Sequence, residues 1–395
     1  MKIAEEFQRA FGRRPEVVVR APGRVNLLGA HVDYNDGWVM PAAIDRAVRL
    51  AAAPGKGRTL RIRALDFDAE AEVDLDHLPA PVPERGNGGS EWSDYPAGVA
   101  WALREAGHDP GAMDVAFTSD VPMRSGVGSS AAVEVAFLLA WRELCGLALD
   151  GIDIPRLGRR AENGYLGVQS GIMDQFASLH GAAGRVIFLD CRQLTFEHLP
   201  FPAGNTVLVA DSGVRRQLAG TGTGYNDRQS ECREAVELLR PHLPGIRALR
   251  DVAEEDFERL SHHLPAVLQR RVRHVLGECR RVRDGAEALR RGDLDAFGEL
   301  VRRSHVSSRD LYEVSIPELD VLAAAAWTVD GCHGARMIGG GFGGCVAVLV
   351  EDGAAGAVRA AMTAAFERRF GRRPAVHTCR VATGASVASS PDGRV

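Results

Sequence analysis

The sequence predicts an α+β protein made of two domains. Strand-like and helix-like segments are mixed along the chain, without the regular strand–helix alternation of a parallel α/β fold. Its 395 residues and 45% hydrophobic content are enough for two cores of ordinary size. Two strand-like segments bracket residues 192–205, and we place the boundary there, which gives domains of 1–205 and 206–385.

The first domain is expected to open on strands and to continue into helices. β-branched and alternating patterns predict strands at 15–23, 47–55 and 59–65 and within 111–122, with a Pro/Gly-rich surface loop at 79–90. Apolar periodicity predicts helices at 94–107, 129–146, 154–167 and 169–181. Ser129 or Ser130 is the expected N-cap of the second of these helices.

The second domain is expected to be mostly helical. A strand at 185–191 ends the first domain, and a strand at 206–213 opens the second and precedes a helical region from Asp227 to Ala326. A glycine-rich and strand-like segment at 334–350, a helix at 353–371 and a strand at 375–383 follow. The small polar residues at 386–395 predict a disordered tail.

Composition excludes several classes of partner. The 48 Lys and Arg residues against 52 Asp and Glu give a net charge of −4, which lacks the basic excess of a nucleic-acid-binding surface. The 7 scattered cysteines form no CxxC pair, which argues against structural zinc and against a disulfide framework. No apolar run approaches the ~20 residues that span a bilayer, and the N-terminus lacks the apolar core of a signal peptide. We therefore expect a cytoplasmic protein without nucleic-acid or membrane partners.

Two glycine-rich segments are candidate nucleotide-binding motifs. In residues 122–137 (PMRSGVGSSAAVEVAF), Gly126, Gly128 and the start of a helix predict an anion site, although a glycine turn with serine caps has the same pattern. Residues 339–344 (GGGFGG) satisfy G-x-G-x-x-G but run into a strand-like segment, which a dinucleotide-binding motif does not. Neither motif contains the G-K-[ST] of a Walker loop, so a Rossmann dehydrogenase and a P-loop enzyme are both disfavoured.

Seven segments together resemble the galactokinase family, within the superfamily that includes homoserine, mevalonate and phosphomevalonate kinases. Any one of them could occur by chance, but seven in family order, from Arg20 to nearly the end of the chain, are specific. The segments are RAPGRVNLLGAHVDYN (20–35), EWSDYPAGV (91–99), DVPMRSGVGSSAAVEVA (120–136), AENGYLGVQSGIMDQFAS (161–178), YNDRQSEC (225–232), SHVSSRDLYEVSIPELD (304–320) and GARMIGGGFGGC (334–345).

The resemblance implies the two-domain GHMP kinase fold, with an N-terminal domain like domain 2 of ribosomal protein S5, a C-terminal ferredoxin-like domain and an active site in the cleft between them. It implies an enzyme that uses ATP and Mg²⁺ to phosphorylate the anomeric hydroxyl of a galactose-type monosaccharide, as a monomer or weak dimer. Phosphoryl transfer needs alignment, charge neutralisation and a group that receives the proton of the nucleophile. The types of residue in these motifs suit those three tasks.

Carried over residue by residue, the resemblance makes Asp174 the catalytic base and Arg24 the transition-state arginine. Taken alone, Asp174 could be a helix cap, and Arg24 could form a salt bridge with Asp33. The implied sugar contacts are Ala30, His31, Asp33, Gly171 and Tyr225, of which Tyr225 could equally be a core residue. The implied nucleotide contacts are Trp92 near the adenine and Gly126, Val127, Gly128, Ser129, Ser130 and Ala131 around the phosphates. Ser130 and Glu162 would hold the Mg²⁺ ion through hard oxygen atoms.

Ala30 is the departure from the family pattern that bears most on the substrate. Galactokinases usually carry Glu at this position, where the carboxylate is thought to contact the C6 end of the sugar. Loss of that charged acceptor would weaken the binding of a sugar 6-hydroxyl by about 1.5–3 kcal/mol. It would also remove the repulsion of a C6 carboxylate. Galacturonate kinases, a related branch, carry a Gly-Ala-His version of this motif. The sequence leaves open galacturonate or another C6-altered sugar, galactose with a water in place of the Glu side chain, and a non-catalytic sugar sensor.

Overall fold

The computed structural model describes residues 3–85, 91–123, 125–215 and 224–389, so part of the predicted loop at 79–90 and the end of the predicted tail lie outside it. The helices are α1 (Ile3–Phe11), α2 (Asp94–Glu105), α3 (Ser129–Cys145), α4 (Asp153–Arg160), α5 (Met173–His180), α6 (Tyr225–Leu239), α7 (Glu254–Leu260), α8 (Ala266–Arg290), α9 (Leu294–Asp310), α10 (Pro317–Trp327) and α11 (Ala355–Phe370). The strands are β1 (Val17–Leu28), β2 (Trp38–Pro54), β3 (Thr59–Ala64), β4 (Ala69–Asp74), β5 (Met113–Ser119), β6 (Arg185–Asp190), β7 (Phe196–Pro200), β8 (Asn205–Asp211), β9 (Cys332–Met337), β10 (Cys345–Glu351), β11 (Ala375–Cys379) and β12 (Ser386–Ser389). Short helical turns are η1 (Asp33–Asn35), η2 (Leu65–Phe67), η3 (Val82–Arg85), η4 (Ala161–Leu166), η5 (Leu249–Asp251) and η6 (Ser261–His263).

The larger sheet has the strand order β12-β1-β2-β5-β3-β4, with β6 paired to β2 and β7 paired to β6. The antiparallel register of β1 on β2 shifts twice, between Pro22 and Arg24 and between Asn26 and Leu28. Such irregularities bend a strand and change where its side chains point, and they are common beside functional sites. The two shifts therefore flank Arg24. The strand then leaves the sheet and continues into residues 29–35, which we call the GAHVDYN loop.

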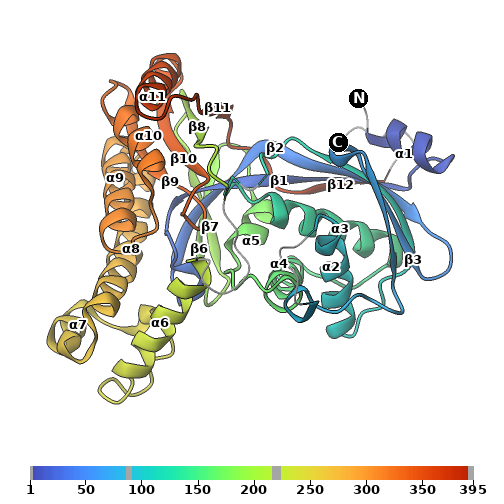
Figure 1. The fold of residues 1–395 in the computed structure, drawn as a ribbon, viewed down its shortest axis with the longest axis horizontal. Coiled ribbons are helices and arrows are strands. Elements are labelled where there is room, and N and C mark those ends of the chain that lie inside the picture. The colour runs from blue at the N-terminus through green and yellow to red at the C-terminus, as the bar shows by residue number, and fades with distance from the viewer. Residues whose placement is uncertain (1–2, 86–90, 124, 216–223, 390–395) are drawn as a thin grey trace.

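Helices cover both faces of this sheet. The apolar residues of α2 and α3, among them Val135 and Trp141, share a core with Val19 of β1 and Leu50 of β2. The opposite face is covered by α1, whose Phe7 packs in a smaller cluster. Figure 1 shows α2–α5 gathered on one side of β1 and β2. This packing fixes the two helix starts, at Ser129 and Met173, that later carry the site.

The smaller sheet is antiparallel, with the order β11-β8-β10-β9. Helices α10 and α11 pack on it through Leu322, Val358 and Phe366. The long helices α8 and α9 lie at the end of the molecule away from α1 (Figure 1). A third cluster joins the two halves, because Leu28 and Met40 of the first sheet pack with apolar residues of α8, α9 and β10.

Two sheets, each with its own helices, confirm the predicted α+β class. The predicted disorder at 386–395 was wrong for Ser386–Ser389, which form β12 and pair with Val17–Arg20 of β1. Edge-strand pairing and the packing of Val387 on the core outweigh the small polar composition of this segment. Strands β4 and β7 were not predicted, because their short alternating patterns are dominated by charged or exposed residues.

Candidate active site

Arg24 and Asp174 form a paired arrangement at the centre of the candidate site. Arg24, which is 4% exposed, donates from Nε to Asp174 Oδ1 at 2.7 Å and from Nη2 to Asp174 Oδ2. Its Nη1 donates to the carbonyl oxygen of Gly126 at 2.6 Å. Asp174 lies in the first turn of α5, and its side chain keeps 25% exposure. One guanidinium group therefore joins the candidate base to the glycine-rich loop, and the alternative Arg24–Asp33 salt bridge is not the pairing observed.

The glycine-rich loop ends at the N-terminus of α3. Gly128 is the N-cap, with φ of 74° in the left-handed region, and a Cβ there would lie 3.2 Å from Arg24 Cγ. The expectation that Ser129 or Ser130 caps the helix was wrong, since no side chain makes the cap hydrogen bond. Both serines belong to the first turn instead, which frees the Ser130 hydroxyl for another partner. Backbone amides at a helix start together with glycines make an anion-binding surface.

The C-terminal domain braces this loop from the other side. Ser125 Oγ donates to Asp211 Oδ2 at 2.9 Å, and Asp211 is the last residue of β8. The second glycine-rich motif packs on the same point, because a Cβ at Gly344 would lie 3.1 Å from the carbonyl oxygen of Ser125. Gly344 of the GGGFGG segment therefore packs directly against the candidate phosphate loop.

Ser130 and Glu162 converge as predicted for a metal site. Ser130 Oγ donates to Glu162 Oε1 at 2.9 Å, and Ser170 Oγ donates to Glu162 Oε2. Glu162 lies on η4, a π-helical turn, and burial raises its pKa. A hydroxyl and a carboxylate are the hard oxygen donors that Mg²⁺ prefers, and this ion keeps several water or phosphate ligands. In the part of the chain that the structure describes, no group of three or more His, Cys, Asp or Glu residues could hold a metal. The donor set thus fits Mg²⁺ held partly by a nucleotide.

Carboxyl groups accumulate around this point. Glu134 of α3 is fully buried, accepts from Gln175 Nε2 at 2.8 Å, and has a pKa raised well above its usual value by burial and by Glu162. Its charge and that of Glu162 are both disfavoured by burial and by the nearby Asp174. Such a group of acids is costly without a cation beside it. We therefore expect a bound divalent cation to lower these pKa values.

Asp33 and Gly171 meet on the sugar side of Asp174. A Cβ at Gly171 would lie 2.0 Å from Asp33 Oδ2, so the carboxylate occupies the space that any other residue would fill. Burial, followed by the charge of Asp174, raises the pKa of Asp33 to about 6. The predicted base and two predicted sugar contacts are thus adjacent in space.

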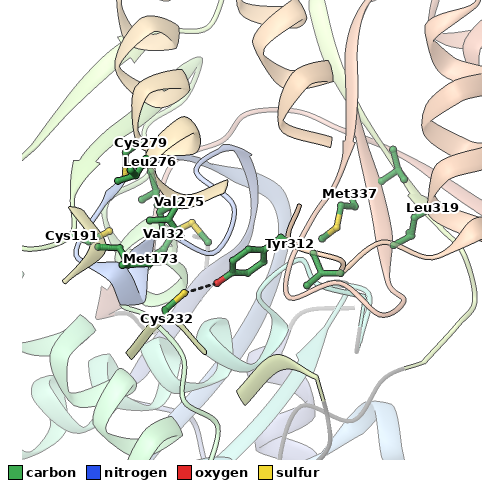
Figure 2. Close-up of a cluster of buried hydrophobic side chains, with 14 of the residues drawn as sticks. Val32, Met173, Cys191, Cys232, Val275, Leu276, Cys279, Tyr312, Leu319 and Met337 are labelled. Atoms are coloured by element: carbon green, nitrogen blue, oxygen red, sulfur yellow. Dashed lines mark hydrogen bonds between the residues drawn. The ribbon is translucent and has the colours of Figure 1, made fainter. Parts of the chain in front are cut away.

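Aromatic and imidazole rings line the other side of the GAHVDYN loop. His31 Nδ1 hydrogen-bonds the Tyr34 hydroxyl at 2.7 Å, which contacts the Tyr312 hydroxyl at 2.9 Å. The Tyr225 ring, at the start of α6, lies with its centroid 5.6 Å from that of His31. Tyr312 also contacts Cys232 Sγ at 3.1 Å, as Figure 2 shows. The structure therefore brings His31 and Tyr225 together, and the half-buried Tyr225 does not lie in the core.

The Ala30 peptide is bound by two residues that lie outside the predicted site. Ala30, which is 3% exposed, donates from its backbone nitrogen to Glu278 Oε1 at 3.0 Å. His274 Nε2 donates to the Ala30 carbonyl oxygen at 3.1 Å. Both residues lie on α8, outside every recognised motif, and the available signal was their helical spacing with Arg271 and Arg281 beside the buried apolar residues of this helix.

Trp92 was predicted to contact the adenine, and none of its described interactions reaches the candidate phosphate loop. Its ring stacks on Phe67 with centroids 6.0 Å apart, and it lies 6.1 Å from the ring of Phe117. Its role near an adenine remains a prediction.

The raised pKa of Asp33 gives a testable pH dependence. As an implied sugar contact, the ionised Asp33 carboxylate can accept hydrogen bonds from sugar hydroxyls at both oxygens. Protonation removes its charge and turns one oxygen into a donor, so falling pH should weaken sugar binding. We expect kcat/KM for the sugar to fall by roughly tenfold per pH unit below a midpoint near 6, because kcat/KM for the sugar reports ionisations of the enzyme form that has not yet bound sugar. The measurement is a pH profile from 5 to 8 at saturating nucleotide. In Asp33→Asn this midpoint should vanish, and a flat wild-type profile over that range would contradict the assignment.

Family comparisons agree with this geometry. The model described as "Galactokinase galactose-binding signature" matches residues 5–54. The models of the GHMP kinase N-terminal and C-terminal domains match residues 94–182 and 286–368. A mevalonate kinase from Methanococcus jannaschii superposes with a TM-score of 0.62 at 16% identity over 93% of this chain and 98% of that one, which supports the fold alone. The class of protein is therefore a GHMP kinase with the predicted two-domain fold.

Relatives at higher identity narrow the class. The galactokinases of Roseiflexus sp. (strain RS-1) and Chloroflexus aggregans (strain MD-66 / DSM 9485) are each 43% identical to this chain, over 97% of it and 96% of their own lengths. The crystal structure of Lactococcus lactis galactokinase complexed with galactose matches with a TM-score of 0.91 and 32% identity, over 97% of this chain and 98% of that one. The chain belongs to the galactokinase family and is a sugar kinase.

Among the described residues, no helix is both long and apolar enough to cross a membrane.

Proposed function

We propose that this enzyme transfers the γ-phosphoryl group of ATP to the anomeric hydroxyl of galactose or of a C6-altered galactose such as galacturonate. The observation that carries the proposal is the Arg24–Asp174 pair, which joins a partly exposed carboxylate to the glycine-rich loop at Gly126. The Asp174 carboxylate, which can accept the proton of the nucleophile, and the Arg24 guanidinium, which can bind the transferring phosphoryl group, are thus held side by side. This is the arrangement that phosphoryl transfer requires.

Each residue of the pair has a distinct task in this proposal. Asp174 accepts the proton of the sugar O1 hydroxyl as that oxygen attacks phosphorus, or orients the hydroxyl before the proton leaves. Arg24 is bound to Asp174 in the free enzyme and stabilises negative charge on the phosphoryl oxygens during transfer. Asp33, His31 and Tyr225 bind the ring hydroxyls and hold O1 in line with the phosphate.

Ser130 and Glu162 would hold Mg²⁺, and the amides from Gly126 to Ala131 would hold the phosphates. When bound, this ion supplies positive charge that neutralises the phosphate oxygens. The Ser130–Glu162 hydrogen bond places Ser130 Oγ 2.9 Å from Glu162 Oε1, so the two oxygen ligands are already adjacent. Trp92 would contact the adenine.

The charges around Ala30 leave room for an anionic substituent at C6 of the sugar. Ala30 offers no carboxylate, and the charged residue that binds its backbone, Glu278, is paired with both Arg281 and Arg336. One carboxylate and two guanidinium groups leave this cluster with a net charge of +1. His274 adds none at neutral pH, because burial lowers its pKa to about 4. A C6 carboxylate would therefore avoid the repulsion that a Glu side chain at position 30 would exert.

A panel of sugars tests the proposed function. ADP release is measured with galactose, galacturonate, N-acetylgalactosamine, arabinose and fucose, and kcat/KM is compared. A preference for galacturonate supports the C6-carboxylate reading, whereas a preference for galactose of more than about tenfold, ~1.4 kcal/mol of transition-state stabilisation, rejects it. No ADP release with any sugar would leave the non-catalytic sensor as the better account.

Ala30→Glu is the reciprocal test of substrate choice. The new carboxylate should accept from a 6-hydroxyl and repel a C6 carboxylate, so the ratio of kcat/KM for galactose over galacturonate should rise about tenfold or more. Ala30→Gln is the matched control, because it adds nearly the same volume and an acceptor without the charge. If Gln and Glu shift the ratio equally, charge repulsion is not the cause.

A further inference from the structure

Helix α8 carries a stripe of polar residues on a face that is otherwise apolar. Arg271, His274, Glu278 and Arg281 recur at helical spacing, and the first three are at most 2% exposed. Figure 2 shows the apolar residues beside this stripe, Val275, Leu276 and Cys279, grouped with Val32 of the GAHVDYN loop. The helix therefore lies directly behind that loop, although the two segments are separated by more than half of the chain.

Glu278 is the central residue of this contact. One of its oxygens, Oε1, accepts from the backbone nitrogens of Gly29 and Ala30, each at 3.0 Å, and from Ser304 Oγ at 2.5 Å. The other oxygen accepts from Arg281 Nε at 2.7 Å. Burial alone would raise the pKa of Glu278, but the neighbouring arginines hold that pKa below its usual range. The Glu278 carboxylate is therefore charged. Charged acceptors form stronger hydrogen bonds with amides than neutral ones do.

His274 holds the other end of the same residue. Its Nε2 donates to the carbonyl oxygen of Ala30, and its Nδ1 accepts from Ser307 Oγ at 2.8 Å, which fixes the tautomer. The imidazole also stacks on Tyr312 with ring centroids 4.3 Å apart, and Tyr312 contacts Tyr34 of the loop. The backbone of residues 29 and 30 is thus bound on both its donor and acceptor sides by one helix of the C-terminal domain.

We propose that Glu278, supported by His274, is a positioning residue that sets the conformation of the sugar-binding loop from the C-terminal domain. Glu278 has no exposed surface and cannot touch the sugar itself. It acts by fixing the two peptide groups that precede His31 and Asp33, so that their side chains face the substrate. The inference rests on the proposed function only in taking this loop as the sugar site. It predicts that sugar recognition depends on α8 while nucleotide binding does not.

The test compares Glu278→Gln and Ser304→Ala with wild type and with Asp114→Asn. Glu278→Gln keeps one carbonyl acceptor but loses the charge, and Ser304→Ala removes only one donor to Glu278, so at least one of the two should fold. Asp114 lies in β5, away from the GAHVDYN loop. It is a matched control because its carboxylate is 2% exposed and is paired with two arginines, Arg13 and Arg61. KM values for sugar and ATP, kcat, and nucleotide binding without sugar are measured for each.

We expect Glu278→Gln to raise the sugar KM about tenfold, with the ATP KM and nucleotide binding within about twofold of wild type. Ser304→Ala should shift the sugar KM in the same direction by a smaller factor, and Asp114→Asn should lower the melting temperature without a sugar-specific effect. Equal changes in both KM values, or a Glu278→Gln enzyme that resembles Asp114→Asn, would overturn the inference. Inactivity of the wild-type enzyme with every sugar would instead count against the proposed function.

Discussion

Asp174→Asn is expected to lower kcat by about 10²–10⁴-fold while sugar and nucleotide still bind. The Asn side chain keeps a carbonyl oxygen that can accept from Arg24 Nε, so the guanidinium retains a partner. The Asn side chain cannot take the proton of the sugar hydroxyl. Among the described residues, Asp174 is the carboxylate that Arg24 binds, so no second carboxylate at this position replaces it. The loss should therefore fall on the chemical step, which single-turnover kinetics at saturating substrates measures directly.

Helix electrostatics need a separate control, because Asp174 lies in the first turn of α5. Removing an acid there weakens the helix by about 0.3–1 kcal/mol without any catalytic cause. Asp153→Asn removes the acid in the first turn of the neighbouring α4 and is the matched comparison. A kcat for Asp174→Asn within about threefold of that control would rule out a base or an essential orienting role.

Arg24→Met is expected to lower kcat by about 10²–10³-fold, the usual effect of removing one strong donor to a charge that develops in the transition state. It should also cost about 1–3 kcal/mol of stability, because it leaves the Gly126 carbonyl without its donor. The measurements are kcat at saturating substrates and the free energy of unfolding in denaturant.

Arg24→Lys separates charge from geometry at the same position. Lysine keeps the positive charge but cannot bind Asp174 through two nitrogens and Gly126 through a third. We expect its kcat to lie between those of Arg24→Met and wild type. If Arg24→Met destabilises the protein but leaves kcat nearly unchanged, Arg24 braces the loop and takes no part in transfer.

Much of the candidate site could be predicted because its residues lie in short, ordered motifs. Arg24, Asp174, Ser130 and Glu162 come from three separate segments, and the structure joins them through direct hydrogen bonds. The fold class followed from the mixture of apolar helices and alternating strands. The fold class therefore came from local patterns, where sequence information is strongest, whereas the grouping of the four site residues came from the resemblance of their motifs to the galactokinase family.

The remaining features depend on contacts between distant parts of the chain. Glu278 and Gly29 are separated by 249 positions, and nothing near Glu278 in sequence indicates that its carboxylate binds a backbone in the other domain. The β12 strand forms because the edge of β1 is available, which composition alone could not reveal. Ser129 or Ser130 was the expected helix cap because capping is a common local role of serine. No side chain caps α3, and Ser130 Oγ instead donates to Glu162, the residue with which the family resemblance had grouped it.

The most direct test of the central claim is the position of the new phosphate on the product. The best sugar of the panel, labelled with carbon-13 at C1, is incubated with ATP and Mg²⁺, and phosphorus–carbon coupling is measured by NMR. The account predicts a single product in which phosphorus couples to C1, lost in parallel with kcat in Asp174→Asn. A phosphate on any other carbon would contradict the placement of the anomeric hydroxyl beside Asp174.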